Sequence, residues 1–447
     1  MNATGFDAIE QREKGLRRGL TSAQLTMIAI GGAIGTGLFL GSSFAIGFAG
    51  PSVIVSYAIG ALIALLLMGC LAEMTVAHPT SGSFGAWAEF YIGPLAGFLV
   101  RYAYWSCIVF AVGTEVTAIA VYMRYWFPQL PGWLWIAGFS SILITVNARN
   151  VKVFGAVEYT FSTLKVTAIM AFILLGGWVV AGTGFCAYTA HGGFFPRGAW
   201  GMWEAVIVSI FSYLSIEMIA VAAGEAEDPQ RAITKAFRST VLRLVVFYLL
   251  TLAIILAIVP WTESGKGESP FITVMAGSHV PFAASVVNLV ILVAALSAMN
   301  SQLYITTRMM FSLARAGHAP RRFGELSARG TPVSALLLSS IGIALATLLN
   351  VLFPEGSFTL MMAISMFGAM FTWLMIFVTH LYFRRAHAGE PLAFRMWGYP
   401  WTSLLGACLM AAILLTTAFT AAFRMTLVYG LPVLAGLALV WRLRSGR

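Results

Sequence analysis

The chain has 447 residues, of which 59% are hydrophobic and only 10% are charged, and its formal net charge at pH 7 is +10. Because a soluble domain carries about 25% charged residues, this composition excludes an ordinary soluble protein and indicates that most of the chain lies in a lipid bilayer. The four cysteines have no paired spacing, so we expect neither a disulfide framework nor a metal site, and no cofactor.

Segments long and apolar enough to span a membrane recur along the chain, since a spanning helix needs about 20 apolar residues. The twelve candidates cover residues 22–48, 51–77, 94–126, 132–148, 155–182, 202–223, 240–260, 281–307, 332–353, 359–383, 402–423 and 425–442. The sequence between them is too short for a soluble domain, so we predict one all-α polytopic membrane domain. The polar N-terminus lacks the short apolar core of a signal peptide, so we expect no cleavage.

Lysine and arginine gather on one side of the predicted membrane. With twelve spans and both chain ends on one side, that side receives 22 of the 27 basic residues, the other side receives four, and Lys165 lies inside a span. Since basic loops stay in the cytoplasm, both termini are predicted to be cytoplasmic, in a cell inner membrane. The positive net charge therefore indicates topology, and we expect no nucleic-acid partner.

The first predicted span contains the stretch AIGGAIGTGLFLG, residues 29–41, with five glycines in eleven residues. Each glycine destabilises a helix by roughly 0.5–1 kcal/mol relative to alanine. Two explanations are open: close helix packing through small residues, or an interruption of the helix inside the membrane.

The sixth predicted span favours an interruption, because its centre, Phe211-Ser212-Tyr213-Leu214-Ser215-Ile216-Glu217, is polar and poor in strong helix formers. Paired breaks in two repeated halves are typical of a transporter site, where half-helix N-termini hold a carboxylate and freed carbonyls hold a cation. The predicted substrate-binding residues are Ala33, Ile34, Gly35, Thr36 and Gly37 in the first break and Phe211, Ser212, Leu214 and Ser215 in the second. We expect the first break to bind a carboxylate and the second to bind an ammonium group.

Ionisable side chains inside a membrane are costly, so each one is a functional candidate. Lys165 lies about 15 Å from the cytoplasmic end of its span, near the midplane of a core about 30 Å thick. A buried ammonium can bind and release a proton at a workable pH, which suggests proton coupling, while a permanently charged structural lysine is the alternative. Glu115 is also near mid-membrane and could bind a substrate amine, carry a proton or pair with another group.

Two further glutamates in predicted spans suggest structural or gating roles. Glu217 closes the second break, where a carboxylate can accept hydrogen bonds from unwound amides. Glu73 lies near the cytoplasmic end of its span and is interpreted as a gate or packing partner. The acidic run at residues 224–229 is expected to meet basic residues of 308–331 when the cytoplasmic side closes.

Four stretches resemble the bacterial amino-acid permeases of the amino acid/polyamine/organocation superfamily, from about residue 16 to at least 385. They are GLTSAQLTMIAIGGAIGTGLFLGS, AEMTVAHPTSGSFGAWAEFYIGPLAGF, SIEMIAVAAGEAEDPQRAI and ALSAMNSQLYITTRMMFSLARAGHAP. The resemblance implies a LeuT-like inverted repeat of five plus five helices, with helices 1 and 6 discontinuous and two helices added at the C-terminus. The expected parts are an N-terminal segment 1–21, repeats at 22–182 and 200–383, and the last two helices at 402–443.

The resemblance also implies proton-coupled uptake of amino acids, with Lys165 in the place of a coupling sodium ion of sodium-driven relatives. The chain departs from the family at Ser215, where glycine is usual, and at Met299 and Gln302, where smaller residues are common. Gln302 is therefore added to the predicted substrate-binding residues. With the bulky pair Met366 and Phe367, these departures suggest a narrower pocket and small or medium neutral amino acids.

Several functions remain open at this stage. An amino-acid exchanger shares the same broken-helix site, and a permease for cationic amino acids could use Glu115. A transporter-like receptor would bind without net transport, although no signalling domain supports it. An enzyme is not expected, because no recognisable catalytic constellation is present in the sequence.

Overall fold

The computed structural model describes residues 4–16, 19–185, 188–227, 245–265, 269–276, 282–353 and 356–445. These residues form helices and loops, with two isolated β-bridges as the only extended pairing among them. The predicted all-α class is therefore confirmed for the described part of the chain. Residues 240–244 of the seventh predicted span lie outside it, as do Asp228 and Pro229.

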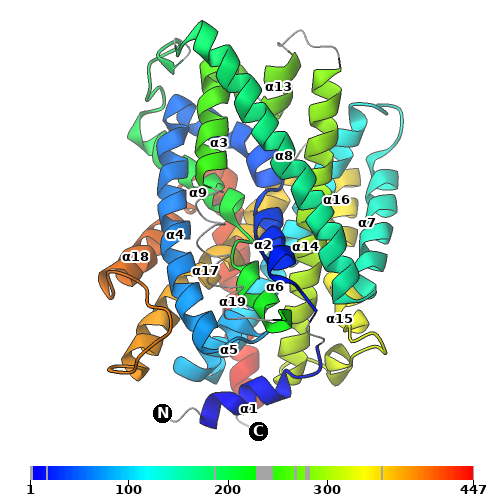
Figure 1. Ribbon diagram of the computed structural model, residues 1–447, viewed down its shortest axis with the longest axis vertical. Helices are drawn as coiled ribbons and strands as arrows, with labels where there is room; N and C mark the ends of the chain where they lie inside the picture. The colour runs from blue at the N-terminus through cyan, green and yellow to red at the C-terminus, as the bar shows by residue number, and fades with distance from the viewer. Residues whose placement is uncertain are drawn as a thin grey trace.

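The helices follow one another closely along the chain (Figure 1). The first half contains α1 (Thr4–Arg12), α2 (Ser22–Ala33), the π-helix η1 (Gly37–Gly41), α3 (Ser42–Ala49), α4 (Val53–Ala77), α5 (Ser83–Tyr91), α6 (Pro94–Arg124), α7 (Gly132–Ala148) and α8 (Val151–Thr183). The second half contains α9 (Gly198–Tyr213), α10 (Met218–Ala222), α12 (Trp261–Ser264), α13 (Pro270–Ala276), α14 (Ala283–Arg315), α15 (Val333–Ser339), α16 (Ile341–Leu352), α17 (Ser357–Ala386), α18 (Trp401–Thr416) and α19 (Arg424–Ser445). An apolar helix at Val245–Ile258 lies between α10 and α12 in the sequence.

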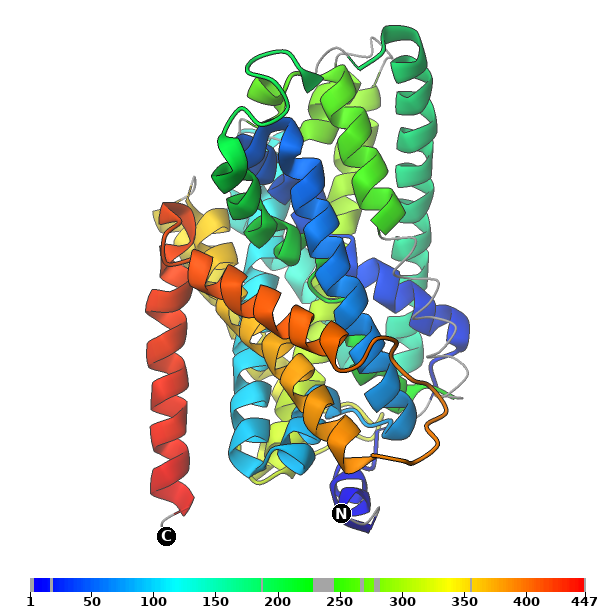
Figure 2. The same cartoon turned by 90° about the vertical axis from the view of Figure 1, so that its left-hand side faces the viewer.

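Eight helical stretches of the described residues are long and apolar enough to cross a membrane, and three shorter apolar helices accompany them. The longest stretch, Ser22–Ala77, contains two of the predicted spans, so every predicted span overlaps an apolar helix. The protein is a polytopic helical membrane protein, while the number of crossings and the inverted repeat stay predictions. Both α1 and the end of α19 lie at one end of the bundle, here called the terminal end (Figures 1 and 2).

Close helix packing places α6 at the centre of the bundle, against α14 and α17. Glycines make this possible, because backbones can approach only where no side chain intervenes. A Cβ at Gly368 of α17 would lie 2.2 Å from the carbonyl oxygen of Ala103, and one at Gly342 of α16 would lie 2.0 Å from that of Val109. The helix α19 stands at the edge of the bundle (Figure 2).

Replacing Gly342 by alanine should therefore separate α16 from α6 and destabilise the protein by about 1–3 kcal/mol, the usual cost of overpacking. The matched control is Gly138→Ala in α7, because a Cβ at Gly138 meets no atom within 4 Å. Melting temperatures of the purified variants test this. We expect a lower value for Gly342→Ala and an unchanged or slightly higher one for Gly138→Ala, and equal values would contradict the packing described.

Candidate functional site

The first predicted span is interrupted at its glycine cluster. The helix α2 begins with a capping box of Thr21 and Gln24 and ends at Ala33. The next residue, Ile34, has φ −83° and ψ 88°, which is not helical. The chain then continues as η1 from Gly37. An interruption of this kind leaves backbone groups without their helical partners, so they need other ones.

The sixth predicted span is interrupted as well, between α9 and α10. Leu214 is extended, with φ −58° and ψ 149°, and Ser215 has a left-handed φ of +79°. Glycine adopts this conformation without steric cost, whereas other residues are disfavoured there. This geometry gives a physical reason for the glycine that is usual at this position in the family.

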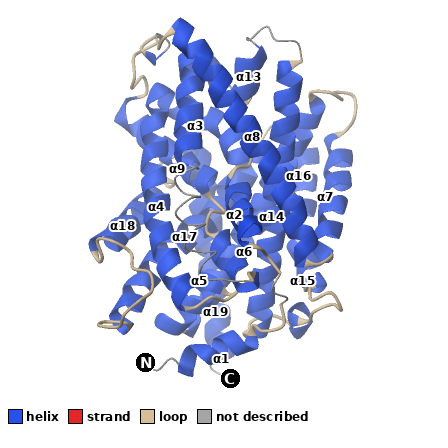
Figure 3. Ribbon diagram, in the orientation of Figure 1, coloured by secondary structure: helices blue, strands red, loops and turns tan. Residues whose placement is uncertain are grey.

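The two interruptions lie side by side near the middle of the bundle (Figure 3). A Cβ at Gly37 would lie 2.7 Å from the Cα of Ser212, and one at Gly32 would lie 3.4 Å from the Cβ of Ser215. The Ser212 hydroxyl donates a hydrogen bond of 2.8 Å to the carbonyl oxygen of Gly37. Residues from both predicted breaks are therefore in direct contact.

Two tyrosines surround Ser212 in the second break. The Tyr57 hydroxyl lies 2.8 Å from the Ser212 hydroxyl, and the Tyr248 hydroxyl donates to the Ser212 carbonyl oxygen at 2.8 Å. Since a carbonyl oxygen has two lone pairs, the Ser212 carbonyl keeps one acceptor site for a further donor. That capacity is compatible with the predicted ammonium contact.

Glu115 of α6 reaches the first break. Its Oε2 accepts a hydrogen bond of 3.4 Å from the backbone N–H of Thr36, and its side chain lies within hydrogen-bonding reach of Gln302. A Cβ at Gly35 would lie 2.9 Å from Glu115 Oε1. Within the described residues, Gln302 Oε1 and Ser215 Oγ are buried and have no hydrogen-bond partner. Buried polar atoms are normally paired, so these two are candidate ligand contacts.

Lys165 of α8 binds the end of α2. Its Nζ donates hydrogen bonds to the carbonyl oxygens of Gly31 and Ile34, the latter at 2.9 Å, and its side chain is fully buried. These carbonyls lie at the C-terminal end of a half-helix, where a positive charge is favoured. Lys165 therefore contacts two carbonyl oxygens next to the interruption of the first span.

Sequence reasoning missed Glu158, a fully buried carboxylate on the same helix as Lys165. It accepts hydrogen bonds from Ser297 at 2.5 Å and Asn300 at 2.9 Å. Glu158 thus takes up the donors of both side chains of α14. The spacing could have revealed it, since residues 158, 162 and 165 share one helix face.

Glu217 has the structural contacts that its position suggests. Its Oε1 accepts hydrogen bonds from the Tyr104 hydroxyl at 2.5 Å and from the backbone N–H of Ser215 at 3.2 Å. Its Oε2 accepts one from the Trp373 indole at 3.2 Å. The carboxylate thus ties the second break to α6 and α17, because those helices supply Tyr104 and Trp373.

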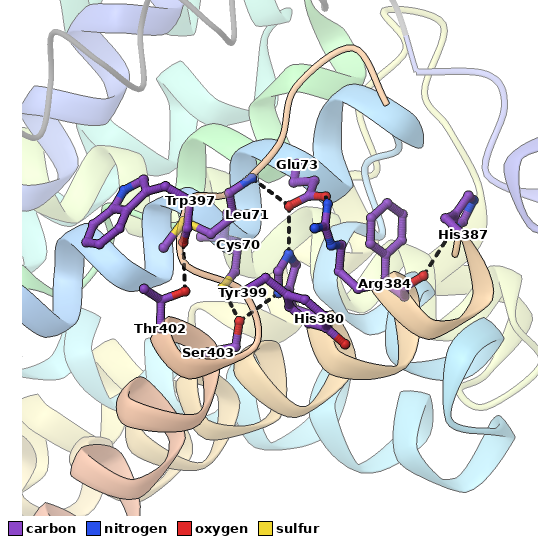
Figure 4. A network of polar contacts seen from close by, with 12 residues as sticks. Cys70, Leu71, Glu73, His380, Arg384, His387, Trp397, Tyr399, Thr402 and Ser403 are labelled. Atoms are coloured by element: carbon purple, nitrogen blue, oxygen red, sulfur yellow. Dashed lines mark hydrogen bonds and ion pairs between the residues drawn. The ribbon is translucent and has the colours of Figure 1, made fainter. Parts of the chain in front are cut away.

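Glu73 belongs to a polar cluster that also contains His380, Arg384 and Ser403 (Figure 4). It lies 2.9 Å from His380 and 2.7 Å from Arg384, both on α17, and it accepts the backbone N–H of Met396 at 2.8 Å. His380 also contacts Ser403 of α18 at 2.9 Å. Glu73 thus contacts α17 and the segment before α18, while its role as a gate or packing partner stays a prediction.

Phe367 does not contribute to the pocket in the way that we expected. A Cβ at Gly430 of α19 would lie 1.9 Å from the Phe367 ring, and this ring is stacked 6.1 Å from that of Phe371. The aromatic ring therefore packs against α19. This packing removes one of the arguments for a small substrate.

The terminal end of the bundle is closed by charged contacts. Arg308 Nε lies 2.7 Å from Glu225 Oε1, with both side chains buried, and the Tyr304 hydroxyl donates to the same carboxylate at 2.6 Å. This pair joins the acidic run at 224–229 to the basic end of α14, as the sequence suggested. The backbone of Leu20 also pairs with that of Ala226, which brings the N-terminal segment to the same place.

Glu13 extends this closure to the loop between α4 and α5 and to α6, and adds a second contact to α14. One carboxylate oxygen accepts hydrogen bonds of 2.7 Å from the Thr80 hydroxyl and the Gly82 N–H, and the other accepts one of 2.6 Å from Ser312 of α14. Arg101 of α6 is 3.6 Å away. The N-terminal segment is thus attached across the terminal end.

Glu89 of α5 reinforces the closure from outside the spans. Burial raises the pKa of its carboxyl, but the hydrogen bond from Arg12 and the charge of Arg101 outweigh burial and lower the pKa below its usual range. A lowered pKa stabilises the closed arrangement above the ordinary pKa of glutamate, and this stabilisation is lost as the pH falls through the lowered value. Glu89 therefore stays ionised near neutral pH.

Comparison with known proteins identifies the family. Residues 24–443 match the amino acid permease family. The chain belongs to this family. It is 38% identical over 432 residues to the aromatic amino acid transport protein AroP of Escherichia coli strain K12, covering 95% of this chain and 94% of the relative. It is also 36% identical over 433 residues to the uncharacterized amino acid permease YtnA of Bacillus subtilis strain 168, covering 94% of each.

The resemblance drawn from the sequence motifs is thus confirmed. Because the family is a class of transporters, the protein is an amino-acid permease of the bacterial inner membrane and not a member of an enzyme class. The two interruptions in contact, the buried ionisable groups and the closure at the terminal end are therefore features of an amino-acid permease.

Gly35 and Gly37 should be essential for ligand binding by the permease. A Cβ at either position would lie 2.7 Å from another atom, on Ala298 for Gly35 and on the Ser212 backbone for Gly37, so alanine displaces the break. Gly41→Ala is the control, because its Cβ would make an ordinary contact of 3.5 Å. Ligand-induced rise in melting temperature measures binding. We expect the ligand-induced rise to disappear in Gly35→Ala and in Gly37→Ala but not in Gly41→Ala. A normal rise in the first two variants would show that the ligand does not bind at the first interruption.

Glu13→Ala should open the terminal end more often, because it removes three hydrogen bonds to an anion, each contributing about 1.5–3 kcal/mol. The test replaces Thr36 by cysteine in a variant that lacks the native cysteines. The rate at which a thiol reagent labels this cysteine measures how often the site is accessible from the terminal end. We expect labelling to accelerate about tenfold or more in Glu13→Ala. The control is Asp7→Ala, because Asp7 is exposed. In this variant the cysteine at position 36 should be labelled at the same rate as in the variant that keeps both Glu13 and Asp7. Equal rates in the two variants would show that the N-terminal segment does not hold the closure.

Proposed function

We propose that this permease imports neutral amino acids, aromatic ones included, by proton symport across the cytoplasmic membrane, with both termini in the cytoplasm. The observation that carries the proposal is the buried ammonium of Lys165 on the carbonyls of Gly31 and Ile34, beside a break that also contacts Glu115. A titratable cation that braces the binding-competent backbone links protonation to substrate binding.

In this proposal, the substrate lies between the two interruptions. The backbone from Ala33 to Gly37 holds its carboxylate at the start of η1, where the positive end of a half-helix favours an anion. The carbonyls near Phe211, Ser212 and Leu214 receive its ammonium group. The breaks belong to two inverted repeats, at 22–182 and 200–383, that move relative to each other during transport.

Lys165 couples the proton to this movement. When protonated, it holds the end of α2 in the conformation that binds the substrate. Release of its proton to the cytoplasm removes the charge that attracts the carbonyls of Gly31 and Ile34, so the end of α2 relaxes and the substrate leaves. Glu115 supports the break through Thr36 and is the second candidate for carrying a proton.

The choice of substrate rests on charge and on the relatives. Among the residues that the structure describes, no pair of acidic residues is dedicated to a cationic side chain, because Glu115 already contacts Thr36 and Gln302. Relatives at 38–39% identity, from Escherichia coli and Salmonella typhimurium, are named for aromatic amino acid transport. Since Phe367 packs against α19, it does not stand in the way of a larger side chain.

Substitution of Lys165 tests the coupling. Lys165→Ala should abolish accumulation driven by an inward proton gradient, while Lys165→Arg, which cannot deprotonate, should bind substrate but arrest the cycle. Uptake into proteoliposomes with and without the gradient measures this. An amino-acid exchanger would instead show uptake that depends on internal amino acid and not on the gradient, and wild-type accumulation by Lys165→Ala would refute the coupling role.

Competition tests the substrate class. Phenylalanine, tyrosine and tryptophan should each reduce uptake of labelled phenylalanine at micromolar to millimolar concentrations, whereas lysine, arginine and glutamate should leave it nearly unchanged. Phenethylamine lacks the carboxylate and should not compete, because the first break would have no anion to hold. Exclusive competition by lysine or arginine would overturn the proposal in favour of a cationic permease.

A further inference from the structure

We propose that Glu158 is a positioning residue for Lys165. The negative charge of Glu158 keeps the protonated lysine on the broken helix, and when the lysine loses its charge, Glu158 passes the effect on to α14. The inference rests on the proposed coupling role of Lys165. It concerns a residue that touches neither of the two predicted breaks directly.

Glu158 and Lys165 act on the same residue of α2. Lys165 donates to the Gly31 carbonyl oxygen, and a Cβ at Gly31 would lie 2.2 Å from Glu158 Oε1. The carboxylate therefore lies against the residue whose carbonyl holds the ammonium. Glycine at 31 is needed because any side chain would strike Glu158 or Ser162, whose hydroxyl would be 2.1 Å from that Cβ.

The neighbours of Glu158 on α14 and α7 hold its carboxylate in place. Asn147 donates to Asn300 Oδ1 at 2.9 Å, which turns the Asn300 amide so that its NH₂ group donates to Glu158 at 2.9 Å. The Ser297 hydroxyl donates to the other oxygen at 2.5 Å. When ionised, the carboxylate accepts both of these hydrogen bonds.

The charged groups near Lys165 are few. Within the described residues, Glu115 comes from α6 and Glu158 from α8 itself, while α14 and α7 contribute the uncharged Ser297, Asn300 and Asn147, and α2 contributes backbone. Protonated Lys165 thus offsets the charge of the buried Glu158 carboxylate. When it loses its proton, that carboxylate is left without a counter-charge in a medium of low polarity, which is unfavourable.

This imbalance gives α14 a part in the cycle. With Lys165 charged, Glu158 is attracted to the ammonium at the end of α2 while its donors hold α14. Once the lysine is neutral, that attraction ends. The contacts of α2 with α8 and with α14 then weaken at the same time. The substrate site and the terminal closure lie on these same helices, since Gln302 and Arg308 are both on α14.

The pH profile of uptake separates a charge role from a packing role. Glu158→Gln keeps the shape but removes the charge, so a higher proton concentration is needed to keep Lys165 protonated. We expect the pH of half-maximal uptake to move down by about one unit, the equivalent of about 1.4 kcal/mol. Ser297→Ala is the matched control: it removes one hydrogen bond to Glu158, keeps the charge, and should change the rate without moving the profile.

Glu158→Asp is a second variant in case Glu158→Gln fails to fold. It retains the charge, so the pH of half-maximal uptake should stay at the wild-type value even if the rate falls. The inference is overturned if Glu158→Gln keeps the wild-type midpoint, or if Ser297→Ala moves the midpoint as far as Glu158→Gln does. If Lys165→Ala accumulates substrate normally, the proposed function fails instead, whatever the profile of Glu158→Gln.

A thermal double-mutant cycle gives a readout that does not depend on transport. Melting temperatures of Glu158→Gln, Lys165→Met and the double variant measure the coupling between the two charges. We expect Lys165→Met to lower the melting temperature less in the Glu158→Gln background than in the wild type, because one unpaired buried charge is removed. Strictly additive effects would overturn the inference, and a parallel cycle with Glu115→Gln measures the share of the other carboxylate.

Discussion

The whole arrangement depends on satisfying backbone groups that an interrupted helix exposes inside a membrane. In hydrocarbon, an unpaired N–H or C=O group costs several kcal/mol, so irregular backbone persists only where protein groups replace the missing bonds. Here Lys165 binds the carbonyls of Gly31 and Ile34, and Ser212 binds that of Gly37. Each partner is a polar side chain from a neighbouring helix. The break in one helix therefore requires polar residues at the facing positions of its neighbours.

The same constraint explains why polar and small residues concentrate around the breaks. Glu217 accepts the Ser215 N–H, and the glycines at 32, 35 and 37 let neighbouring groups approach within about van der Waals contact. A bulkier sequence would separate the two interruptions and leave their backbone groups unpaired. Binding a zwitterion then requires little more, because the donors and acceptors that brace the breaks lie beside the groups that remain free.

Sequence alone predicted the helices and the breaks because both leave local signals, namely apolar length and glycine content. It also located Lys165 and Glu115, since a charge in the middle of an apolar run is conspicuous. Glu158 lies near the start of its span, where a charge looks like a membrane-interface residue, and only the partners supplied by α7 and α14 reveal its burial. Phe367 was misread for a related reason: helical spacing alone does not say which neighbour a face meets, and here Gly430 of α19 receives the ring.

The position of Glu13 shows the limit of local signals most clearly. Its neighbours Arg12 and Lys14 make the N-terminal segment look like an ordinary charged tail, yet its carboxylate is buried and receives donors from Thr80, Gly82 and Ser312. These donors come from elements about 70 and 300 residues away, so no window of sequence contains them. Asn300, Gln302, Arg308 and Ser312 all lie on α14. Under the proposed coupling, a displacement at Glu158 would therefore reach both the site and the terminal closure through one helix, which is why the proposal assigns α14 the connection between the charge of Lys165 and the opening of the terminal end.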